Sequence, residues 1–453
     1  NMKRRLLSAF LAVMMVLTMA PVAFAADTET TTEYVAQVDG TNYETLADAI
    51  EAANNKTLTL LKDVNGQIVI PEGKTVTLDL NGNTVTAPSG RYDAVINQGT
   101  LTVTDSQKTG EIISNGNGGI GISAGSDTTI EYAKVTGREG AIGGDKSTVG
   151  AKLTINDGVF TGVDNAVVIF NGSKRDGDAN KITINGGIFN GKIQSPGYIA
   201  CGIYAPWKDD ITVNNGTFNI ENGAGIVARG GMVTVKGGEF NTTGNITGMV
   251  GDYKGTVPCS ALVFDSTAGY PGMNDDSQIV VEDGKFKSDV AAVTVIKQTS
   301  DAGNRVKVTG GTFSSDVSAY VAEGYVQNNG TVEQLGETNA VAEVGGTYYK
   351  TLAEAVSAAD NNTVTLLKNT VEDVVIPADK TITLDLNGKK IVNSTTAQDS
   401  KVANDARKHT ITNNGTLTIM DSVGGGVVDN VSHQRAALYN NGTITEIKGG
   451  KFT

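Results

Sequence analysis

The sequence predicts an all-β protein built as a parallel β-solenoid, which is a stack of coils made of short strands. Three observations predict this fold class: an eight-residue motif occurs six times, a second apolar segment lies between its copies, and the copies have the spacing of solenoid coils. The chain has 453 residues, of which 56 are Gly and 19% are charged. This composition is too apolar and too regular for a disordered protein.

The repeated motif alternates like a strand and then turns. Its first and third positions are apolar and mostly β-branched, and its second position is polar in most copies. The sixth position is always Gly and follows Asp, Asn or Gly, residue types that tolerate positive φ, which indicates a turn. The eighth position is always Phe, beside a variable seventh position, so the Phe rings are expected to point inward. The copies begin at Leu153, Ile182, Ile211, Val233, Ile279 and Val306.

The spacing of the copies distinguishes a solenoid from a propeller. The Phe-to-Phe separations are 29, 29, 22, 46 and 27 residues. Twenty-two residues cannot supply the four strands of a propeller blade, whereas a solenoid coil needs only two or three. Each column should therefore stack on itself about 4.8 Å apart, with the Phe column forming an aromatic ladder.

The solenoid is expected to begin with a capping helix, and this beginning occurs twice. Leu46, Ala49, Ile50 and Ala53 form an apolar stripe at helical spacing, suited to cover the open edge of the first coil. Residues 36–83 match residues 342–389 at 28 of 48 positions. The predicted organisation is a capped β-helix over 35–331, a junction over 332–340 and a second unit over 341–453. The sequence stops inside another copy of the motif, so we expect this second unit to be truncated at its C-terminus.

The N-terminus indicates export. Lys3, Arg4 and Arg5 precede an apolar segment and a small-residue motif, so residues 1–25 are predicted to be a signal peptide cleaved before Ala26. A Thr/Glu-rich linker follows over 26–34, and no later apolar run is long enough to span a membrane. We therefore expect a secreted or cell-surface protein without a transmembrane segment in the mature fragment. The formal charge of −13 disfavours binding to nucleic acid.

The order of these segments resembles a known superfold. An amphipathic helix, then TVTLDLNG, then NQGTLTVTDS or NNGTLTIMDS, then ITINGGIF-type coils resembles the right-handed parallel β-helix of the pectate-lyase-like superfold. More narrowly, it resembles tandem β-helix repeats of secreted Gram-positive bacterial surface proteins. The resemblance covers nearly all of the mature chain. It is specific for fold and weak for function, since lyases, hydrolases, adhesins and passive stalks share the superfold.

For an enzyme, the resemblance implies a carboxylate cluster, often with calcium, and a basic residue near the scissile bond. The Gly-His-Gly, Arg-Ile-Lys and Trp-x-Asp-His tracts of such enzymes do not occur in this chain. The remaining catalytic candidates share one loop edge: Asp209, Asp210, Asp275, Asp276, Lys208 and Arg229. Asp is also a common turn residue, so catalysis stays open and a non-catalytic protein is preferred. The loops hold enough carboxylates for a structural calcium ion, although the nonapeptide calcium repeat is absent; no cofactor or metal ligand is assigned.

Two insertions, 241–258 and 265–278, flank a single strand, and insertions in repeat proteins often mark the binding face. With Tyr204, Trp207 and Tyr270 nearby, this edge is expected to bind polysaccharide or a host or cell-surface protein. Surface-loop insertions are also well tolerated without any function. The predicted function is a secreted, non-catalytic surface protein, an adhesin-like binding module or a spacer. The alternatives are a polysaccharide lyase or glycoside hydrolase and a purely structural surface stalk.

The two cysteines are expected to stay unbridged. Cys201 and Cys259 lie in the same strand column with another strand, at 224–228, between them. Two coil steps are ~9.6 Å, whereas a disulfide needs Cα atoms about 4.4–6.8 Å apart.

Overall fold

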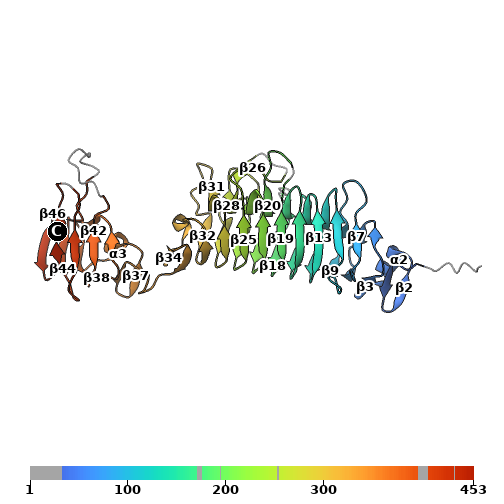
Figure 1. Ribbon diagram of the computed structural model, residues 1–453, viewed down its shortest axis with the longest axis horizontal. Coiled ribbons are helices and arrows are strands. Elements are labelled where there is room, and N and C mark those ends of the chain that lie inside the picture. Colours follow the sequence, from blue (N-terminus) through green and yellow to red (C-terminus); the bar gives the residue numbers. More distant parts are fainter. Residues whose placement is uncertain (1–32, 171–175, 194, 252–254, 396–406, 433) are drawn as a thin grey trace, which may run out of the picture.

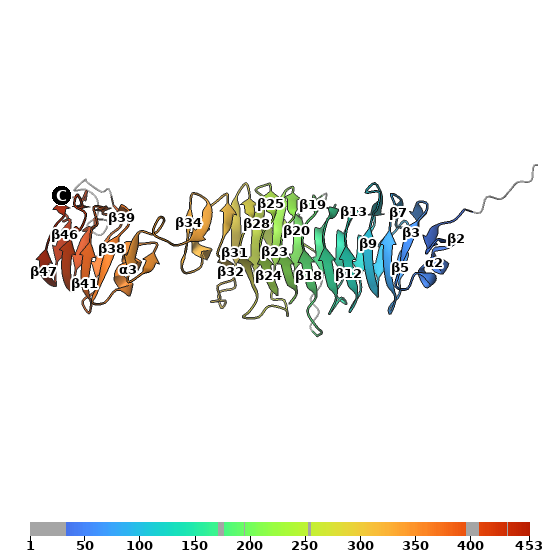
Figure 2. The same ribbon diagram turned by 90° about the horizontal axis from the view of Figure 1, so that it is seen from below.

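The computed structural model describes residues 33–453 except 171–175, 194, 252–254, 396–406 and 433. The predicted signal peptide at 1–25 and nearly all of the linker at 26–34 therefore lie outside the described residues. Figures 1 and 2 show short strands stacked side by side along the molecule. The described chain is mostly β, with two short α-helices and one 3-10 turn, η1 (Ser318–Tyr320).

The first unit consists of three long sheets. Sheet A contains, in spatial order, β2 (Thr41–Tyr43), β1 (Ala36–Val38), β3 (Lys56–Leu60), β6 (Thr75–Asp79), β9 (Thr100–Thr104), β12 (Asp127–Ile130), β15 (Lys152–Ile155), β18 (Lys181–Ile184), β21 (Asp210–Val213), β24 (Met232–Val235), β29 (Gln278–Val281) and β32 (Val306–Val308). Sheet B contains β4 (Val64–Asn65), β7 (Thr84–Thr86), β10 (Glu111–Ser114), β13 (Ala133–Gly137), β16 (Gly158–Gly162), β19 (Ile188–Gly191), β22 (Thr217–Ile220), β25 (Glu239–Thr242), β30 (Lys285–Lys287), β33 (Gly311–Phe313), β35 (Thr331–Gln334) and β34 (Tyr325–Asn328). Sheet C contains β5 (Ile68–Ile70), β8 (Val95–Asn97), β11 (Gly118–Ile122), β14 (Gly140–Gly144), β17 (Ala166–Phe170), β20 (Ala200–Ala205), β23 (Gly223–Ala228), β28 (Ser260–Asp265) and β31 (Ala291–Ile296).

Consecutive strands visit the three sheets in turn. Strands β6, β7 and β8 lie in sheets A, B and C, and β9, β10 and β11 repeat the cycle. From β3 to β22 each strand pairs in parallel with the strand three places further along, as β6 does with β9 and β9 with β12. Beyond the β26–β27 hairpin, β23, β24 and β25 pair in parallel with β28, β29 and β30. This all-β arrangement of stacked parallel sheets is consistent with the predicted β-helix.

The Phe ladder confirms the inward column of the motif. Neighbouring rings have centroids 4.5–5.2 Å apart and planes within 12° of each other. All six rings are buried, and the Gly two residues before each has a φ between 99° and 137°, which only Gly adopts readily. The stacked rings are Phe160, Phe189, Phe218, Phe240, Phe286 and Phe313.

Aspartates anchor the turns from sheet A to sheet B in the early coils. Asp105 accepts hydrogen bonds from Gly82 N and Gly110 N, both at 2.7 Å. In the second unit Asp421 accepts from Gly388 N at 2.8 Å and from Gly426 N at 2.7 Å. Because each carboxylate satisfies turn amides of two successive coils, the repeated LDLNG and TDS-type or MDS-type sequences have a structural explanation.

The predicted amphipathic helix is α2 (Leu46–Ala52), and its counterpart is α3 (Leu352–Ala358). The side chains of Thr45 and Thr351 cap the two helices by accepting hydrogen bonds from the amides of Asp48 and Glu354. Ala49 and Ile50 of α2 are buried in the core of the first unit.

The second unit repeats this plan in shorter sheets. Sheet E contains β37 (Thr347–Tyr349), β36 (Ala342–Val344), β38 (Asn362–Leu366), β41 (Thr381–Asp385), β44 (Thr416–Met420) and β47 (Thr443–Ile447). Sheet F contains β39 (Thr370–Val371), β42 (Lys390–Val392), β45 (Val427–Asp429) and β48 (Lys451–Phe452), and sheet G contains β40 (Val374–Ile376), β43 (Ile411–Asn413) and β46 (Leu438–Asn440). Its buried side chains form a hydrophobic cluster separate from that of the first unit. Strand β35 pairs with β33 and β34, so the first stack extends to Gln334, inside the junction expected over 332–340.

Candidate functional site

The outer face of sheet C is covered in the later coils and open in the earlier ones. In its later coils this face is covered by sheet D, a hairpin of β26 (Thr247–Met249) and β27 (Thr256–Pro258) that belongs to the 241–258 insertion. Val250 and Val257 pack with Tyr204, Val227 and Val263 in a small hydrophobic cluster outside the main core. In its earlier coils the face is open, and it is there that the structure has a cleft.

The cleft has a volume of about 470 Å³ and lies over β8, β11 and β14. Along one outward column of sheet C the residues are Ile96, Gly121, Gly143 and Ile169, paired in register from strand to strand. The two central positions are glycines, so the floor strands carry no side chains of their own there, and the Asp93 carboxylate lies over Gly121. Three strand-to-strand steps of about 4.8 Å make this floor ~14 Å long.

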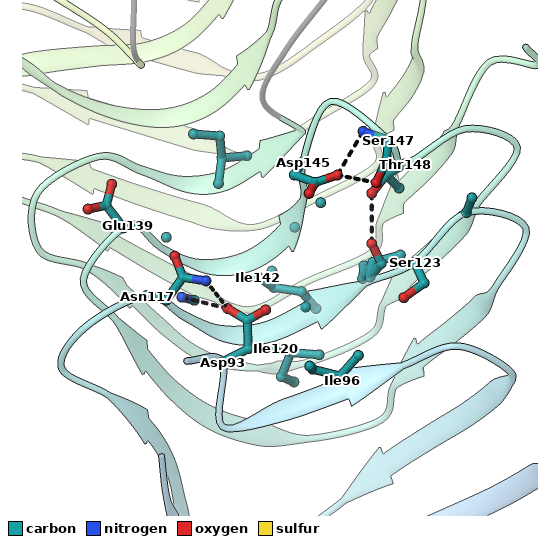
Figure 3. Close-up of a pocket in the computed structure, with 18 of the residues that line it drawn as sticks. Asp93, Ile96, Asn117, Ile120, Ser123, Glu139, Ile142, Asp145, Ser147 and Thr148 are labelled. Carbon is teal, nitrogen blue, oxygen red and sulfur yellow. Dashed lines mark hydrogen bonds between the residues drawn. The ribbon is translucent and has the colours of Figure 1, made fainter. Parts of the chain in front are cut away.

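Polar residues line both sides of the floor (Figure 3). Asp93, Asn117 and Glu139 precede three successive strands of sheet C and form one rim. The opposite rim consists of Ser123, Asp145, Ser147 and Thr148, which follow β11 and β14. The two rims therefore place carboxylates, amides and hydroxyls on both sides of a flat floor.

Asp93 lies over the floor because the strand beneath it has no side chains there. A Cβ at Gly118 or Gly121 would collide with the Asp93 carboxylate. Asp93 Oδ1 accepts hydrogen bonds from Gly118 N and Asn117 Nδ2, each at 2.8 Å. Burial raises the pKa of Asp93, and the negative charge of Asp145 adds to the rise, whereas the two hydrogen bonds oppose it.

The other charged residues leave the cleft acidic. Asp145 is exposed, and its Oδ1 accepts a hydrogen bond from Ser147 N at 2.7 Å. Glu139 is 3.4 Å from the guanidinium of Arg91, whose side chain is 81% exposed, so this ion pair neutralises Glu139 only weakly. Among the described residues of the lining, three carboxylates thus stand against one largely solvated cation.

The aromatic residues that were expected to form a binding edge are buried. Tyr204, Trp207 and Tyr270 are 1%, 2% and 6% exposed. The hydroxyls of Tyr204 and Tyr270 lie 3.1 Å apart, beneath the loops that cover this end of sheet C. As they stand, these rings offer no exposed surface to a ligand, and their observed role is packing.

Arg229 belongs to the same buried network. It is fully buried, and its Nε donates to Asp265 Oδ2 at 2.9 Å. Its two remaining nitrogens donate to Tyr204 Oη and to the Gly255 carbonyl oxygen, both at 3.1 Å. Because all of these donors are used internally, Arg229 holds the covering loops to sheet C.

The predicted carboxylate candidates differ in burial. Asp209 is 1% exposed and accepts from Asn180 N at 3.2 Å and Asn180 Nδ2 at 3.0 Å. Its Oδ2 has no hydrogen-bond partner among the described residues, and burial raises its pKa to about 7. By contrast, Asp210, Asp275 and Asp276 are exposed.

Lys208, the last of the predicted candidates, is half-buried. Its Nζ lies 5.1 Å from the centre of the Trp207 ring, so it contacts a buried aromatic side chain.

A second cleft, of about 480 Å³, lies beside the 265–278 loop. Two of its charged side chains are occupied: Arg305 Nε contacts both carboxylate oxygens of Asp301 at 3.0–3.1 Å, and Arg305 Nη1 donates to three backbone carbonyls. The third, Asp275, is exposed. This cleft therefore has fewer free polar groups for a ligand than the one over β8, β11 and β14.

Sequence reasoning missed the residues of the open cleft, although a signal was present. GGIGI at 118–122 and GAIGG at 140–144 are the two strands of sheet C richest in glycine, and each follows a polar residue, Asn117 or Glu139. Glycine in a strand interior often marks a close approach of another group. The repeated motif begins later, at Leu153, so these coils lie outside it.

Among the described residues, no group of three or more His, Cys, Asp or Glu side chains could hold a metal ion. None of the helices in this part of the chain is long and apolar enough to cross a membrane. No protein-family model, no curated protein and no solved structure matches the chain.

Proposed function

We propose that this protein is a secreted, non-catalytic surface protein that binds carbohydrate in the open cleft of sheet C. The proposed scaffold is a right-handed parallel β-helix of the pectate-lyase-like kind, with α2 covering its first coil. The observation that carries the proposal is the combination of a glycine-containing floor, over which the Asp93 carboxylate lies, with polar rims contributed by successive coils.

This geometry suits a chain of sugar rings. A flat floor of strand backbone accepts a flat ligand, and the isoleucines at its ends, Ile96 and Ile169, supply apolar contact. The rims present acceptors at Asp93, Glu139 and Asp145 and both donor and acceptor atoms at Asn117, which match sugar hydroxyl groups. Because the rims repeat from coil to coil, the cleft is suited to a repeating polymer.

Glycan-array binding tests the proposal. The full chain, Asp145→Asn and the control Asp127→Asn are applied to the same array. Asp127 is a half-exposed carboxylate on the outer face of sheet A, so both exchanges remove one negative charge from the surface. Specific binding that Asp145→Asn weakens and Asp127→Asn preserves supports the cleft. If no glycan binds, a spacer or structural stalk accounts better for the protein.

One observation favours a second candidate, a glycoside hydrolase. Asp93 has a raised pKa and lies within the electrostatic influence of Asp145 across a cleft. Hydrolases use one carboxyl group held protonated and one held ionised. Incubation with a polysaccharide panel decides between them: new reducing ends that Asp93→Asn abolishes would assign catalysis, and binding without cleavage supports the non-catalytic proposal.

A further inference from the structure

We infer that the cleft of sheet C selects polysaccharides that carry free amino groups, so that its ligand is a cationic amino-sugar polymer. This inference rests on the proposed function and names the class of carbohydrate. It comes from the charges on the two rims and from the space between them.

The first step is the charge of the cleft. Asp93 and Glu139 lie on one rim and Asp145 on the other, whereas Arg91 is the only basic side chain among the described residues that line the cleft. Arg91 is already directed to Glu139. A polymer of uronic acids would bring further negative charge between these carboxylates, and like charges at close range oppose binding.

The second step is the repulsion between the rims. The charge of Asp145 contributes to the raised pKa of Asp93, so the two carboxylates interact across the space where a ligand would lie. A cation placed between them is attracted by both and relieves their repulsion. The Asp93 carboxylate is held in place by Gly118 N and Asn117 Nδ2, so it need not reorganise to accept a cation.

The third step distinguishes an ammonium group from a metal ion. Calcium takes six to eight oxygen ligands at short distance. The described residues contain no group of three or more carboxylates or other ligating side chains close enough for that. An ammonium group needs only two or three acceptors, and the sugar ring that carries it can lie in the cleft beside the Asp93 carboxylate, which itself covers Gly121.

The experiment compares two oligosaccharides of the same sugar backbone, one with charged free amino groups and one in which acetylation has removed the charge. A glucosamine hexamer with free amino groups and its fully N-acetylated form are titrated into the full chain by calorimetry. We expect the free-amine hexamer to bind about tenfold or more tightly than the acetylated one, with the difference falling as salt is raised. Asp145→Asn should reduce this preference severalfold, whereas Asp127→Asn should leave it unchanged.

The two exchanges also control for non-specific attraction, because a chain with a formal charge of −13 attracts any polycation. Equal effects of Asp145→Asn and Asp127→Asn would overturn the inference. Equal affinity for both hexamers would also overturn the inference, but it would leave the proposal of carbohydrate binding intact. If neither hexamer nor any other glycan binds, the proposed function itself is wrong. Calcium chloride titrated alone is the last arm: binding that Asp145→Asn abolishes would assign the acidic cleft to a metal ion instead.

Discussion

Replacing Phe218 by Ala tests the stacked architecture on which the cleft depends. The ring is fully buried, and its centroid lies 4.5 Å from those of both Phe189 and Phe240. An aromatic side chain buries about 150–250 Å², which at ~25 cal/mol per Å² corresponds to ~4–6 kcal/mol. Partial collapse of the cavity reduces this, and Phe→Ala exchanges in cores cost ~3–5 kcal/mol. We expect that loss of unfolding free energy.

The matched control is Thr217→Ala, one residue earlier in β22. Thr217 is half-buried and lies next to the ring in sequence, and its exchange should cost under ~0.5 kcal/mol. Urea unfolding followed by Trp207 fluorescence measures both, because Trp207 is the only tryptophan, is buried, and reports on the first unit alone. Equal losses for the two variants would refute the inward Phe column.

Three further predictions concern buried and stacked polar groups. Burial raises the pKa of Asp209 to about 7, so the folded state favours the protonated carboxyl group. The stability that Asp209 contributes is therefore fully present below the unfolded pKa of about 4 and is lost as the pH rises to about 7. The free energy of unfolding should fall by up to ~4 kcal/mol over this range. Asp209→Asn should flatten this pH dependence in urea melts at pH 4 and pH 8, and an unchanged dependence would contradict the assignment. Asn156, Asn185 and Asn214 form a hydrogen-bonded column across three coils: Asn185 Nδ2 donates to Asn156 Oδ1 at 2.8 Å, and Asn185 Oδ1 accepts from Asn214 Nδ2 at 2.7 Å. Asn185→Ala should therefore cost about 1 kcal/mol in the same melts, and no loss would mean that this asparagine column does not contribute to stability. Both cysteines are free and buried, and burial raises the pKa of the Cys201 thiol to about 12. Two thiols should therefore react with a thiol reagent in the denatured, unreduced protein, and none in the native protein at pH 8. An intramolecular disulfide found by peptide mapping would contradict this.

The repeated elements were predictable from sequence because each column has one physical requirement. The invariant Gly adopts positive φ, and the invariant Phe is buried in a continuous ladder, as the motif predicts. The amphipathic segment at Leu46 is a helix, and its N-cap at Thr45 follows from residue type. Because these local requirements recur from coil to coil, the same residue pattern appears several times in one sequence, and each copy predicts the same turn and the same buried ring.

The site was not predictable in the same way. Tyr204 and Trp207 have the residue types of a binding surface, but the 241–258 and 265–278 insertions cover them, and nothing in a sequence shows which loop folds over which strand. Asp93 and Asp145 lie 52 positions apart in the chain and line the same cleft only because successive coils stack. Their proximity is a property of the register between coils, which is set by the core rather than by the residues of the cleft.

The most direct test of the proposed site is a crystal structure of the full chain with its tightest-binding glycan. We predict electron density for sugar rings in the cleft over β8, β11 and β14, between Asp93 and Asp145. Density in the cleft beside Asp301 and Arg305, or on any other surface with the floor of sheet C left empty, would contradict the assignment of the binding site.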